Sequence, residues 1–427
     1  MKFTSPLLMA ILGCAALRAG PALAATLMVL NNNDSGAGSL RQTILAAGSG
    51  DTVLFASTVS GTITLTSGGL PIAKDLTIHG PGANVLTINA NDSSRVFNVS
   101  AGTFNITGLT LANGVSSSSS SGGGGDMTIA AAAVVNILNC RITGGRSGYD
   151  GGGIDNLGAL TVNDCTFDNN YCTNNSGGAL NSAASVALTN CTFTANRGGY
   201  GGGLFIHGTG VVQSCTIVSN TGPGGGGGIF FNGTVTVISS LIARNTSANG
   251  ADIYDVGISG GYNLISETNR STGFGLAGSH DQVGTTASPL DPLLGPLQIN
   301  GGTTPTMALL RGSPAIDKGK SGGLTSDQRG RPRVFDFSAV TNPGGGDGSD
   351  IGAYELNPPV LAITRVGSNV LLSWSTSESG YKLQTNANII APTGWGLLPG
   401  TPAVVAGRYT VTNTAASGSR FYRLSNP

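Results

Sequence analysis

Between residues 130 and 260 the chain repeats one pattern of apolar and polar positions about every 25 residues. Each repeat has apolar side chains five and three positions before a small residue, with Gly210 as the one exception, and another two positions after it. An asparagine or glycine then follows, and a glycine-rich turn leads to a further apolar residue. The central small residues are Cys140, Cys165, Cys191, Cys215 and Ser240. Self-similarity at such a period indicates a solenoid, in which each repeat is one coil.

The apolar positions change phase inside each repeat. Alternation before the central residue predicts a strand with every second side chain inward. The inward phase then shifts by one, so a straight strand would turn its core face outward, and we expect a corner there. Each coil becomes strand, corner, strand, asparagine turn, glycine turn and strand, which stacks into a parallel β-helix. Residues 50–290 predict about nine or ten coils at ~25 residues each.

A leucine-rich repeat is the main alternative, because residues 157–167 match its L-x-x-L-x-L-x-x-C-x-L consensus. The other repeats have Ala132, Ala183 or His207 where Leu157 stands. The half-repeat that would form a helix reads GGYGGG or GPGGGGG, and glycine strongly disfavours helix. The pattern therefore favours the β-helix.

Helical periodicity marks the region after the leader. Ser39 and Gln42 form an S-x-x-Q capping box. Three apolar residues add a helical stripe, namely Leu40, Ile44 and Leu45. We expect residues 25–49 to form an N-terminal helical cap, because the end of a solenoid exposes an apolar cross-section.

The first residues have the pattern of an export signal. An apolar run from Pro6 to Leu17 precedes an A-x-A motif that ends at Ala24, so we expect residues 1–24 to be removed. The alternative is a lipoprotein signal, ILGC, that ends at Cys14. Both interpretations place the protein outside the cytoplasm. No apolar run reaches the ~20 residues of a membrane span.

Several phrases carry a resemblance to known proteins. The repeats CTFDNN…SGGAL and CTFTAN…GGGLF resemble those of secreted bacterial right-handed parallel β-helix proteins of the polymorphic outer-membrane-protein type. The opening NNNDSGAGSLRQTILAAGSGDTVLF, residues 31–55, resembles their N-terminal cap. Residues 261–357, with GYNLI, SDQRGRPR and DIGAYE, are similar to the choice-of-anchor Q domain, and residues 358–427, with LAITRVGSNVLLSWS, resemble a fibronectin-III-like sandwich.

This resemblance implies a fold class and a location but no reaction. The fold is all-β: a right-handed, pectin-lyase-like parallel β-helix over residues 50–260, continued by its C-terminal part over 261–357. A small β-sandwich follows over 358–427. The implied location is extracellular or on the cell surface.

Composition and charge limit the classes of partner. The chain has 69 glycines, only 10% charged residues and a formal net charge of zero. These values argue against a nucleic-acid surface or a basic membrane-binding patch. We expect no metal and no cofactor, because carboxylates do not cluster along the repeats. Asp347 and Asp350 in GGGDGSD could hold Ca²⁺, but we interpret this segment as a solvated loop.

Two columns of residues that recur from coil to coil have structural interpretations. We expect the cysteine column (Cys140, Cys165, Cys191 and Cys215) to be a stack of buried free thiols. Side chains in register point the same way, which leaves Cβ atoms farther apart than the ~3.8 Å of a relaxed disulfide. Asparagine tolerates left-handed turns and can bond to a neighbouring coil. The asparagine column (Asn170, Asn196, Asn220 and Asn245) therefore needs no ligand.

Catalysis on this fold would need two carboxylates in one groove, ~5–10 Å apart for hydrolysis. The nearest pairs in sequence are Asp150 with Asp155 and Asp164 with Asp168. Each is also ordinary for an exposed coil. The three histidines (His79, His207 and His280) fall in unrelated contexts, and no Ser-His-Asp or Cys-His grouping emerges. We expect a non-catalytic protein, with a polysaccharide lyase or hydrolase and a structural adhesin stalk as alternatives.

One column of residues is a candidate binding site. Each strand after the glycine turn begins with an inward apolar residue, so the next residue points outward. In five successive coils these are Asp155, Asn181, Phe205, Phe230 and Tyr254. Exposed aromatic residues are costly unless they are used or covered. Either the segment after Tyr254 or the C-terminal sandwich packs over the rings, or they form a platform for sugar rings with Asp155 and Asn181 as polar contacts. We predict a polysaccharide or another surface component as the partner.

Overall fold

The computed structural model describes residues 24–116, 123–174, 176–375, 381–390, 393–405, 407–414 and 418–425. Most of the predicted export signal, including Cys14, lies outside these ranges. Within them, no helix is long and apolar enough to cross a membrane.

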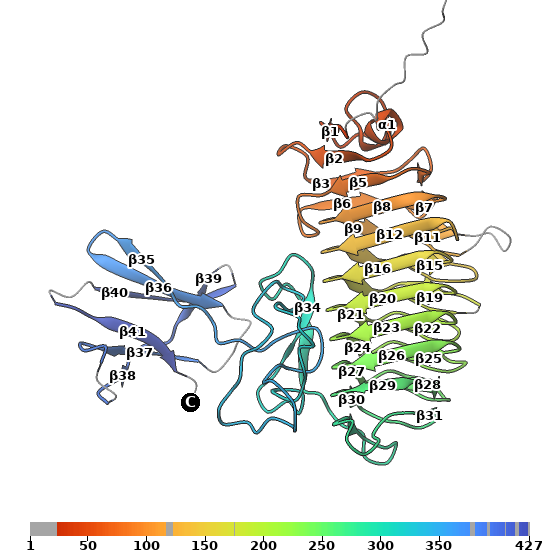
Figure 1. Cartoon of the computed structure of the whole chain (residues 1–427). Helices are drawn as coiled ribbons and strands as arrows, with labels where there is room; N and C mark the ends of the chain where they lie inside the picture. Colours follow the sequence, from red (N-terminus) through yellow and green to blue (C-terminus); the bar gives the residue numbers. More distant parts are fainter. Residues whose placement is uncertain are drawn as a thin grey trace, which may run out of the picture.

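The chain folds into a parallel β-helix of about nine turns, as predicted (Figure 1). Three parallel sheets, here called A, B and C, run along the rod. Sheet A consists of β1 (Thr26–Val29), β2 (Asp51–Phe55), β5 (Leu76–His79), β8 (Gly102–Thr107), β12 (Ala133–Leu138), β16 (Ala159–Asn163), β20 (Ser185–Thr189), β23 (Thr209–Gln213), β26 (Thr234–Ile238) and β29 (Ile258–Gly261). Sheet B consists of β3 (Gly61–Thr64), β6 (Leu86–Asn89), β9 (Thr110–Ala112), β13 (Arg141–Thr143), β17 (Thr166–Asp168), β21 (Thr192–Thr194), β24 (Thr216–Val218), β27 (Leu241–Ala243), β30 (Leu264–Ile265) and β32 (Gln282–Val283).

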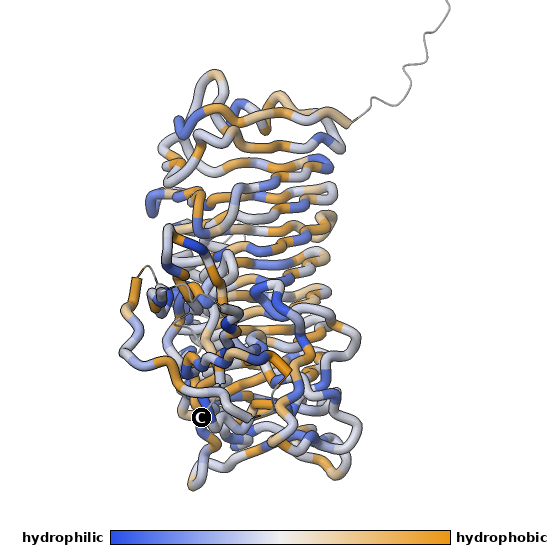
Figure 2. The backbone as a smooth tube through the Cα atoms, turned by 90° about the vertical axis from the view of Figure 1, so that its left-hand side faces the viewer, coloured by the Kyte–Doolittle hydropathy of each residue, from blue (hydrophilic) through white to orange (hydrophobic). Residues whose placement is uncertain are grey.

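Sheet C follows the glycine turns. It consists of β4 (Leu70–Ile72), β7 (Phe97–Val99), β11 (Met127–Ile129), β15 (Ile154–Asn156), β19 (Leu180–Ser182), β22 (Leu204–Ile206), β25 (Ile229–Phe231), β28 (Ile253–Val256) and β31 (Ser271–Thr272). Between sheets B and C, the short strands β10 (Val115–Ser116), β14 (Arg146–Ser147) and β18 (Tyr171–Cys172) pair in parallel. Figure 2 shows similar hydropathy recurring from coil to coil.

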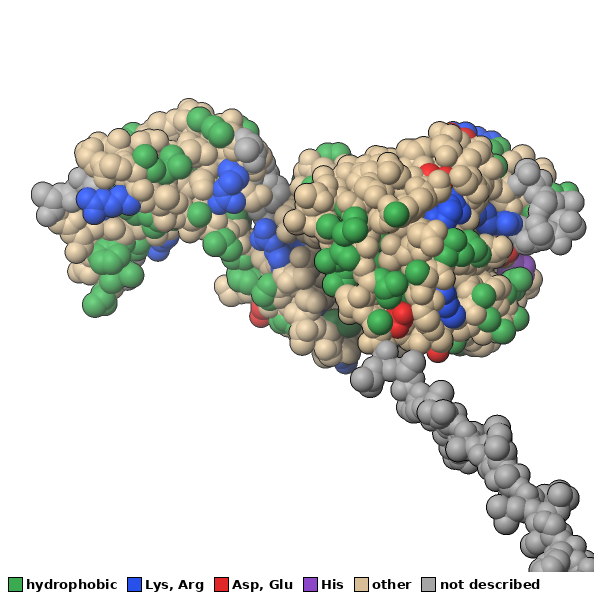
Figure 3. Space-filling view, turned by 90° about the horizontal axis from the view of Figure 1, so that it is seen from above, with side chains coloured by type: hydrophobic (Ala, Val, Ile, Leu, Met, Phe, Trp, Pro, Cys, Tyr) green, Lys and Arg blue, Asp and Glu red, His purple; other side chains and the backbone are tan. Residues whose placement is uncertain are grey.

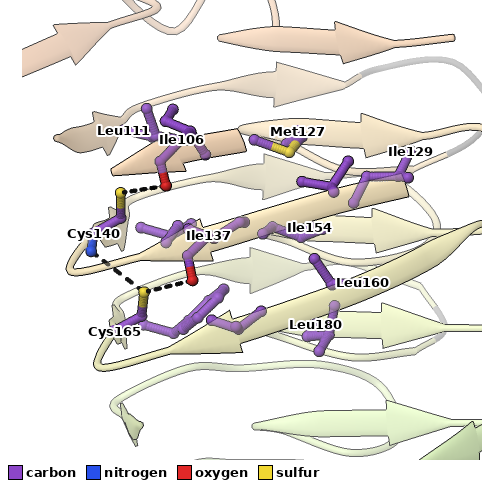
Figure 4. Close-up of a cluster of buried hydrophobic side chains, with 14 of the residues drawn as sticks. Ile106, Leu111, Met127, Ile129, Ile137, Cys140, Ile154, Leu160, Cys165 and Leu180 are labelled. Carbon is purple, nitrogen blue, oxygen red and sulfur yellow. Dashed lines mark hydrogen bonds between the residues drawn. The ribbon is translucent and has the colours of Figure 1, made fainter. Parts of the chain in front are cut away.

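The predicted corner between sheets A and B is present. The residue before each central small residue has a left-handed backbone, with φ of 51° at Asn139, 56° at Asp164, 52° at Asn190 and 50° at Ser214. This turn swings the chain so that the inward phase can shift by one residue. The core inside the three sheets is closely packed with Ile, Leu, Val and Phe side chains (Figure 4).

A short helix lies at the N-terminal end of the rod. Helix α1 spans Leu40–Ala46, and the Ser39 side chain accepts a hydrogen bond from the Gln42 N–H at 3.2 Å. Leu40 and Ile44 pack into the core of the rod. The sequence predicts Leu45 in the same apolar stripe, but its side chain is 61% exposed, so it lies outside the buried stripe. That α1 serves as a lid stays a prediction.

We call residues 290–357 the flank segment. The sequence predicts that residues 261–357 continue the β-helix, and this is wrong for the flank segment. Only residues up to β32 add turns to the rod, and the flank segment instead packs on the outer face of sheet B. It contains the antiparallel pair β33 (Leu294–Gln298) and β34 (Thr306–Leu309). The physical reason is that outward residues of β24, β27 and β30 are apolar: Val218, Leu241 and Leu264 share a core with Leu294, Leu309, Ile351 and Tyr354 of the flank segment.

Polar contacts fix the flank segment in place. Buried Gln328 accepts a hydrogen bond from the Thr192 hydroxyl at 2.6 Å and donates to the Thr166 hydroxyl at 2.9 Å. The Ala353 N–H donates to Thr216 Oγ1 at 3.0 Å. The three threonines occupy the same outward position in β17, β21 and β24, so one row of sheet B binds the flank segment.

The C-terminal residues form two small antiparallel sheets. One contains β35 (Ala362–Val366), β36 (Asn369–Ser375), β40 (Arg408–Thr414) and β39 (Ala403–Val405). The other contains β38 (Gly396–Leu397), β37 (Lys382–Asn386) and β41 (Phe421–Ser425). Leu372, Trp374 and Leu383 form the centre of a separate core. Figure 1 places these sheets beyond the flank segment, on the side of the rod that carries sheet B.

Candidate functional site

The five predicted site residues lie side by side on the outer face of sheet C. Strand register pairs Asp155 with Asn181, Asn181 with Phe205, Phe205 with Phe230 and Phe230 with Tyr254. Each side chain points away from the core that its neighbours in the strand fill. We call these residues the outer file. Its first two members are polar and its last three are aromatic.

The aromatic members pack on one another rather than presenting open ring faces. Phe230 and Tyr254 are stacked, with ring centroids 4.8 Å apart and planes at 19°. Phe205 meets Phe230 edge-on at 4.9 Å and is only 8% exposed. Tyr200, from a glycine turn, meets Phe230 edge-on at 5.4 Å and is 42% exposed. Tyr200 and the outer parts of Phe230 and Tyr254 therefore offer the accessible aromatic surface.

The rings are flanked by the glycine turns of their own coils. A Cβ atom on Gly225 would lie 3.2 Å from the Phe230 ring and 3.4 Å from that of Tyr254, so glycine lets the turn lie close to the rings. The C-terminal sheets are one of the two covers that the sequence predicts for these rings. Those sheets lie on the side of sheet B, away from the outer file (Figure 1).

The polar members form a hydrogen-bonded chain across three coils. Asp155 Oδ1 accepts from Asn181 Nδ2 at 2.7 Å, and Oδ2 accepts from the Gly123 N–H at 2.9 Å. Asn181 Oδ1 lies 3.1 Å from His207 Nε2. His207 was missed by the sequence interpretation, although it stands two residues after Phe205 and period-two alternation could have placed it on the same side.

Burial sets the electrostatics of this chain. Desolvation raises the pKa of Asp155, although the hydrogen bonds from Asn181 and Gly123 act in the opposite direction. Desolvation lowers the pKa of His207, against the attraction of Asp150 and Asp155. Both shifts disfavour the charged form of the group, because burial removes the water that would solvate the charge. Figure 3 shows charged side chains in small scattered groups on the N-terminal end of the molecule.

A shallow concavity extends the same face toward the N-terminus. It has a volume of about 350 Å³ and is lined by Gly69, Pro71, Ser94, Arg95, Asn98, Val115 and Ser116. Pro71 and Asn98 occupy the position in β4 and β7 that Asp155 occupies in β15. Arg95 donates to the carbonyls of Gly123 and Gly124 at 3.1 and 3.0 Å. The concavity thus lies on the same face as the outer file, but buried Thr128, Asp155 and Asn181 separate it from the accessible aromatic members.

The candidate carboxylate pairs differ in their surroundings. Asp150 accepts from the Ser176 hydroxyl at 2.5 Å and influences both Asp155 and His207. Asp168 forms a two-pronged pair with Arg141, each contact at 2.7 Å. Asp164 lies at the corner near the flank segment, where burial raises its pKa to about 6. The pair Asp164 and Asp168 is thus engaged in structural contacts.

The remaining candidates lie elsewhere. His79 is exposed on sheet A, and His280 stacks on Tyr262 with centroids 5.1 Å apart. Asp347 accepts from Ser321 and Ser349, and Asp350 accepts from the Asp317 and Leu356 N–H groups. Among the described residues, no group of three or more His, Cys, Asp or Glu side chains could hold a metal ion.

The four column cysteines are buried free thiols in the structure, and they also serve the corner. Cys140 N–H donates to Cys165 Sγ at 3.3 Å (Figure 4). The Cys165 thiol donates to the Asn163 carbonyl at 3.0 Å. At the end of the column, Ser240 Oγ accepts a hydrogen bond from the Cys215 N–H at 3.1 Å. The column therefore has two roles. Its side chains pack in the core, and they accept a hydrogen bond from a backbone N–H that the corner removes from the sheet.

The asparagine column forms a ladder. Asn170, Asn196 and Asn220 each donate through Nδ2 to Oδ1 of the next asparagine at 2.9–3.0 Å. Asn245 donates in the same way to Asp252, at 2.9 Å. The left-handed turn residues precede the column, with φ of 57° at Asn169 and 56° at Ala195. The column's role is thus bonding between coils, while its neighbours make the turn.

Comparison of the sequence with protein-family models and with curated proteins gives no match.

Proposed function

We propose that the protein is an exported or cell-surface β-helix scaffold that binds a polysaccharide along the outer file without cleaving it. The observation that carries the proposal is the accessible cluster at the aromatic end of the outer file, which consists of Tyr200, His207, Phe230 and Tyr254. It offers imidazole and phenol groups and aromatic edges on neighbouring coils, which are stacked ~4.8 Å apart. A polysaccharide is a long repeating ligand that presents hydroxyl groups and apolar C–H faces. A rigid line of such side chains suits it.

Two features favour binding over catalysis. Both oxygens of Asp155 accept hydrogen bonds from the protein, and its side chain is almost fully buried. Asp150 is held by Ser176. A general acid or nucleophile must instead reach the scissile bond.

A lyase or hydrolase is the second candidate, and the polar chain is the observation that favours it. His207 and two carboxylates, Asp150 and Asp155, influence one another on one face of the rod. Desolvated groups with shifted pKa values often belong to catalytic sites. Measurement of product formation separates this candidate from simple binding.

The test uses a glycan array on the purified protein without its leader, followed by affinity measurement on the best glycan. The double substitution Tyr200→Ala with His207→Ala should weaken binding at least tenfold, because it removes an accessible ring and the terminal hydrogen-bonding group. Leu157→Ala is the matched control, since Leu157 is 43% exposed and stands outside the outer file. Binding that is absent for all glycans, or equal in both variants, would refute the proposal.

Two further measurements complete the test. Release of reducing ends or of unsaturated sugar products from the bound glycan, lost in Asp155→Asn, would establish the enzyme instead. The exported location predicts that the mature N-terminus, read by mass spectrometry after secretion, follows Ala24. A chain that carries an acyl group on Cys14 would establish the lipoprotein alternative.

A further inference from the structure

Among the described residues, no segment of the chain packs over the outer face of sheet A, apart from a contact of Ser321 with Gln213 at its edge. The flank segment covers sheet B, and the glycine turns flank the outer file on sheet C. Figure 1 shows strands β12 to β26 across the front of the rod with no other segment over them. Their outward side chains are half-buried or exposed throughout. A face of this size is either solvated by charged groups or covered by a partner.

Charged groups are missing from this face. Every outward position of β8, β12, β16, β20, β23 and β26 carries Thr, Ser, Asn, Gln, Ala, Val, Leu or Ile. Val134, Leu138 and Val211 are each about 40% exposed. Depletion of charge is the compositional signal of the centre of a protein interface. A solvated antiparallel or parallel sheet face would normally carry Lys or Glu.

The shape of the face fits a flat partner. The strands pair in register, so the outward side chains form straight rows with small residues such as Thr161, Ala187 and Val211 in the central row. A shallow concavity of about 370 Å³ lies in its middle, lined by outward residues that include Thr161, Ala187 and Val211. Nine strands from β2 to β29, at ~4.8 Å spacing and ~17 Å width, give roughly 700 Å². That area is close to the ~800 Å² per partner of a standard interface.

We propose that two copies of this chain associate face to face through the outer surface of sheet A, related by a two-fold axis. In such a dimer the same patch meets itself, so like charges would repel and none is present. Threonine, serine and asparagine both donate and accept hydrogen bonds, and identical faces can therefore pair. The outer file lies on a different sheet and stays accessible in the dimer. This inference does not depend on the proposed function.

The experiment measures mass by light scattering and sedimentation from ~1 to ~100 μM, the range over which a standard interface gives measurable dimers. The wild-type chain without its leader should shift from monomer to dimer or remain dimeric. The triple substitution Thr161→Lys, Ala187→Lys and Val211→Lys should raise the dimer dissociation constant at least a hundredfold. Its glutamate counterpart should do the same, and an equimolar mixture of the two variants should recover a heterodimer.

Controls make the outcome decisive. Thr246→Lys, at an exposed turn of the rod, should leave association unchanged. Circular dichroism and thermal melting identify a variant that fails to fold, in which case Ala187→Lys alone is tested. A wild-type chain that stays monomeric at 100 μM would overturn the proposal. So would a triple lysine variant that dimerises as tightly as wild type, or a wild-type dimer whose chemical cross-links map to another face. A monomer whose sheet A face instead binds an insoluble polysaccharide would also overturn it.

Discussion

At the scale of single residues, the columns of the repeat are explained by the hydrogen bonds that a corner and a turn remove from the sheets. At the corner between sheets A and B, the backbone N–H of one coil points to a side chain in the next coil. Cys165 accepts this hydrogen bond through its sulfur, and Ser240 accepts the equivalent bond through its hydroxyl oxygen. Small side chains that can accept a hydrogen bond are therefore required there.

The first prediction tests this role at Cys165. Cys165→Ser should change the free energy of unfolding by less than about 1 kcal/mol, because the hydroxyl keeps the acceptor, as Ser240 does. Cys165→Ala should cost about 1–3 kcal/mol, because the buried Cys140 N–H loses its partner. Denaturant unfolding of both variants measures the difference. Equal losses would mean that the thiol acts only by packing.

The second prediction concerns Asp252, which ends the asparagine ladder. Burial raises its pKa to about 7, while hydrogen bonds from Asn245 and Glu267 act in the opposite direction. Its folded pKa lies above the unfolded value of ~3.9, so the folded chain binds more protons between these pH values. The free energy of unfolding should therefore fall as pH rises from about 4 to 7, by an amount on the order of a few kcal/mol.

The check is urea unfolding from pH 4 to 8. Asp252→Asn should flatten part of this decline, whatever its effect on absolute stability, since the amide does not titrate. Asp255→Asn, at an exposed neighbouring position, should keep the wild-type slope. An unchanged slope in Asp252→Asn would show that other buried carboxyls, such as Asp350, cause the decline.

At the scale of elements, each face of the rod has its own outward chemistry. Sheet B presents a threonine row and apolar residues, which bind the flank segment. Sheet C presents the outer file, and sheet A presents uncharged small residues. The inward positions are nearly interchangeable from coil to coil, so the specificity of the molecule lies in the outward ones.

The third prediction tests the attachment of the flank segment. Gln328 is 1% exposed and bonds to threonines of β17 and β21. Gln328→Ala should lower the free energy of unfolding by about 2–4 kcal/mol, because it strands buried hydroxyl groups. Hydrogen exchange should rise in residues 291–357 and stay unchanged in sheet A. Gln298→Ala, an exposed glutamine of β33, is the control and should alter neither.

At the scale of the whole molecule, the rod and the C-terminal sheets have separate cores. About nine coils at ~4.8 Å each give a rod roughly 45 Å long. The C-terminal sheets add length on the side of sheet B. The molecule is therefore elongated along the solenoid and broadened toward its C-terminal end.

The fourth prediction uses this division. Deletion of residues 358–427 should leave the melting temperature of the rod within about 2 °C, because the separate cores share no apolar cluster. Small-angle scattering of the chain without its leader should give an elongated particle before and after the deletion. A compact sphere, or a large loss of thermal stability, would contradict the prediction.

The sequence by itself determined the solenoid, its corner and the register of the outer file. A 25-residue period with a fixed shift of inward phase leaves only one way to close a coil, and the strand register then places Asp155 beside Asn181 and Phe205 beside Phe230. Ser39 as the helix cap was also visible locally. All of these follow from short-range pattern and stacking.

Only the tertiary structure decided how outward residues are used. The flank segment lacks the period of the coils, so its packing on the threonine row of sheet B depends on contacts about 140 residues apart in sequence, such as Thr166 with Pro305. The ring planes of Phe230 and Tyr254, and the approach of His207 to Asn181, depend on rotamers and on neighbouring coils. A repeat pattern fixes which side of a strand a residue occupies, but the partner it meets there is set by how distant segments pack.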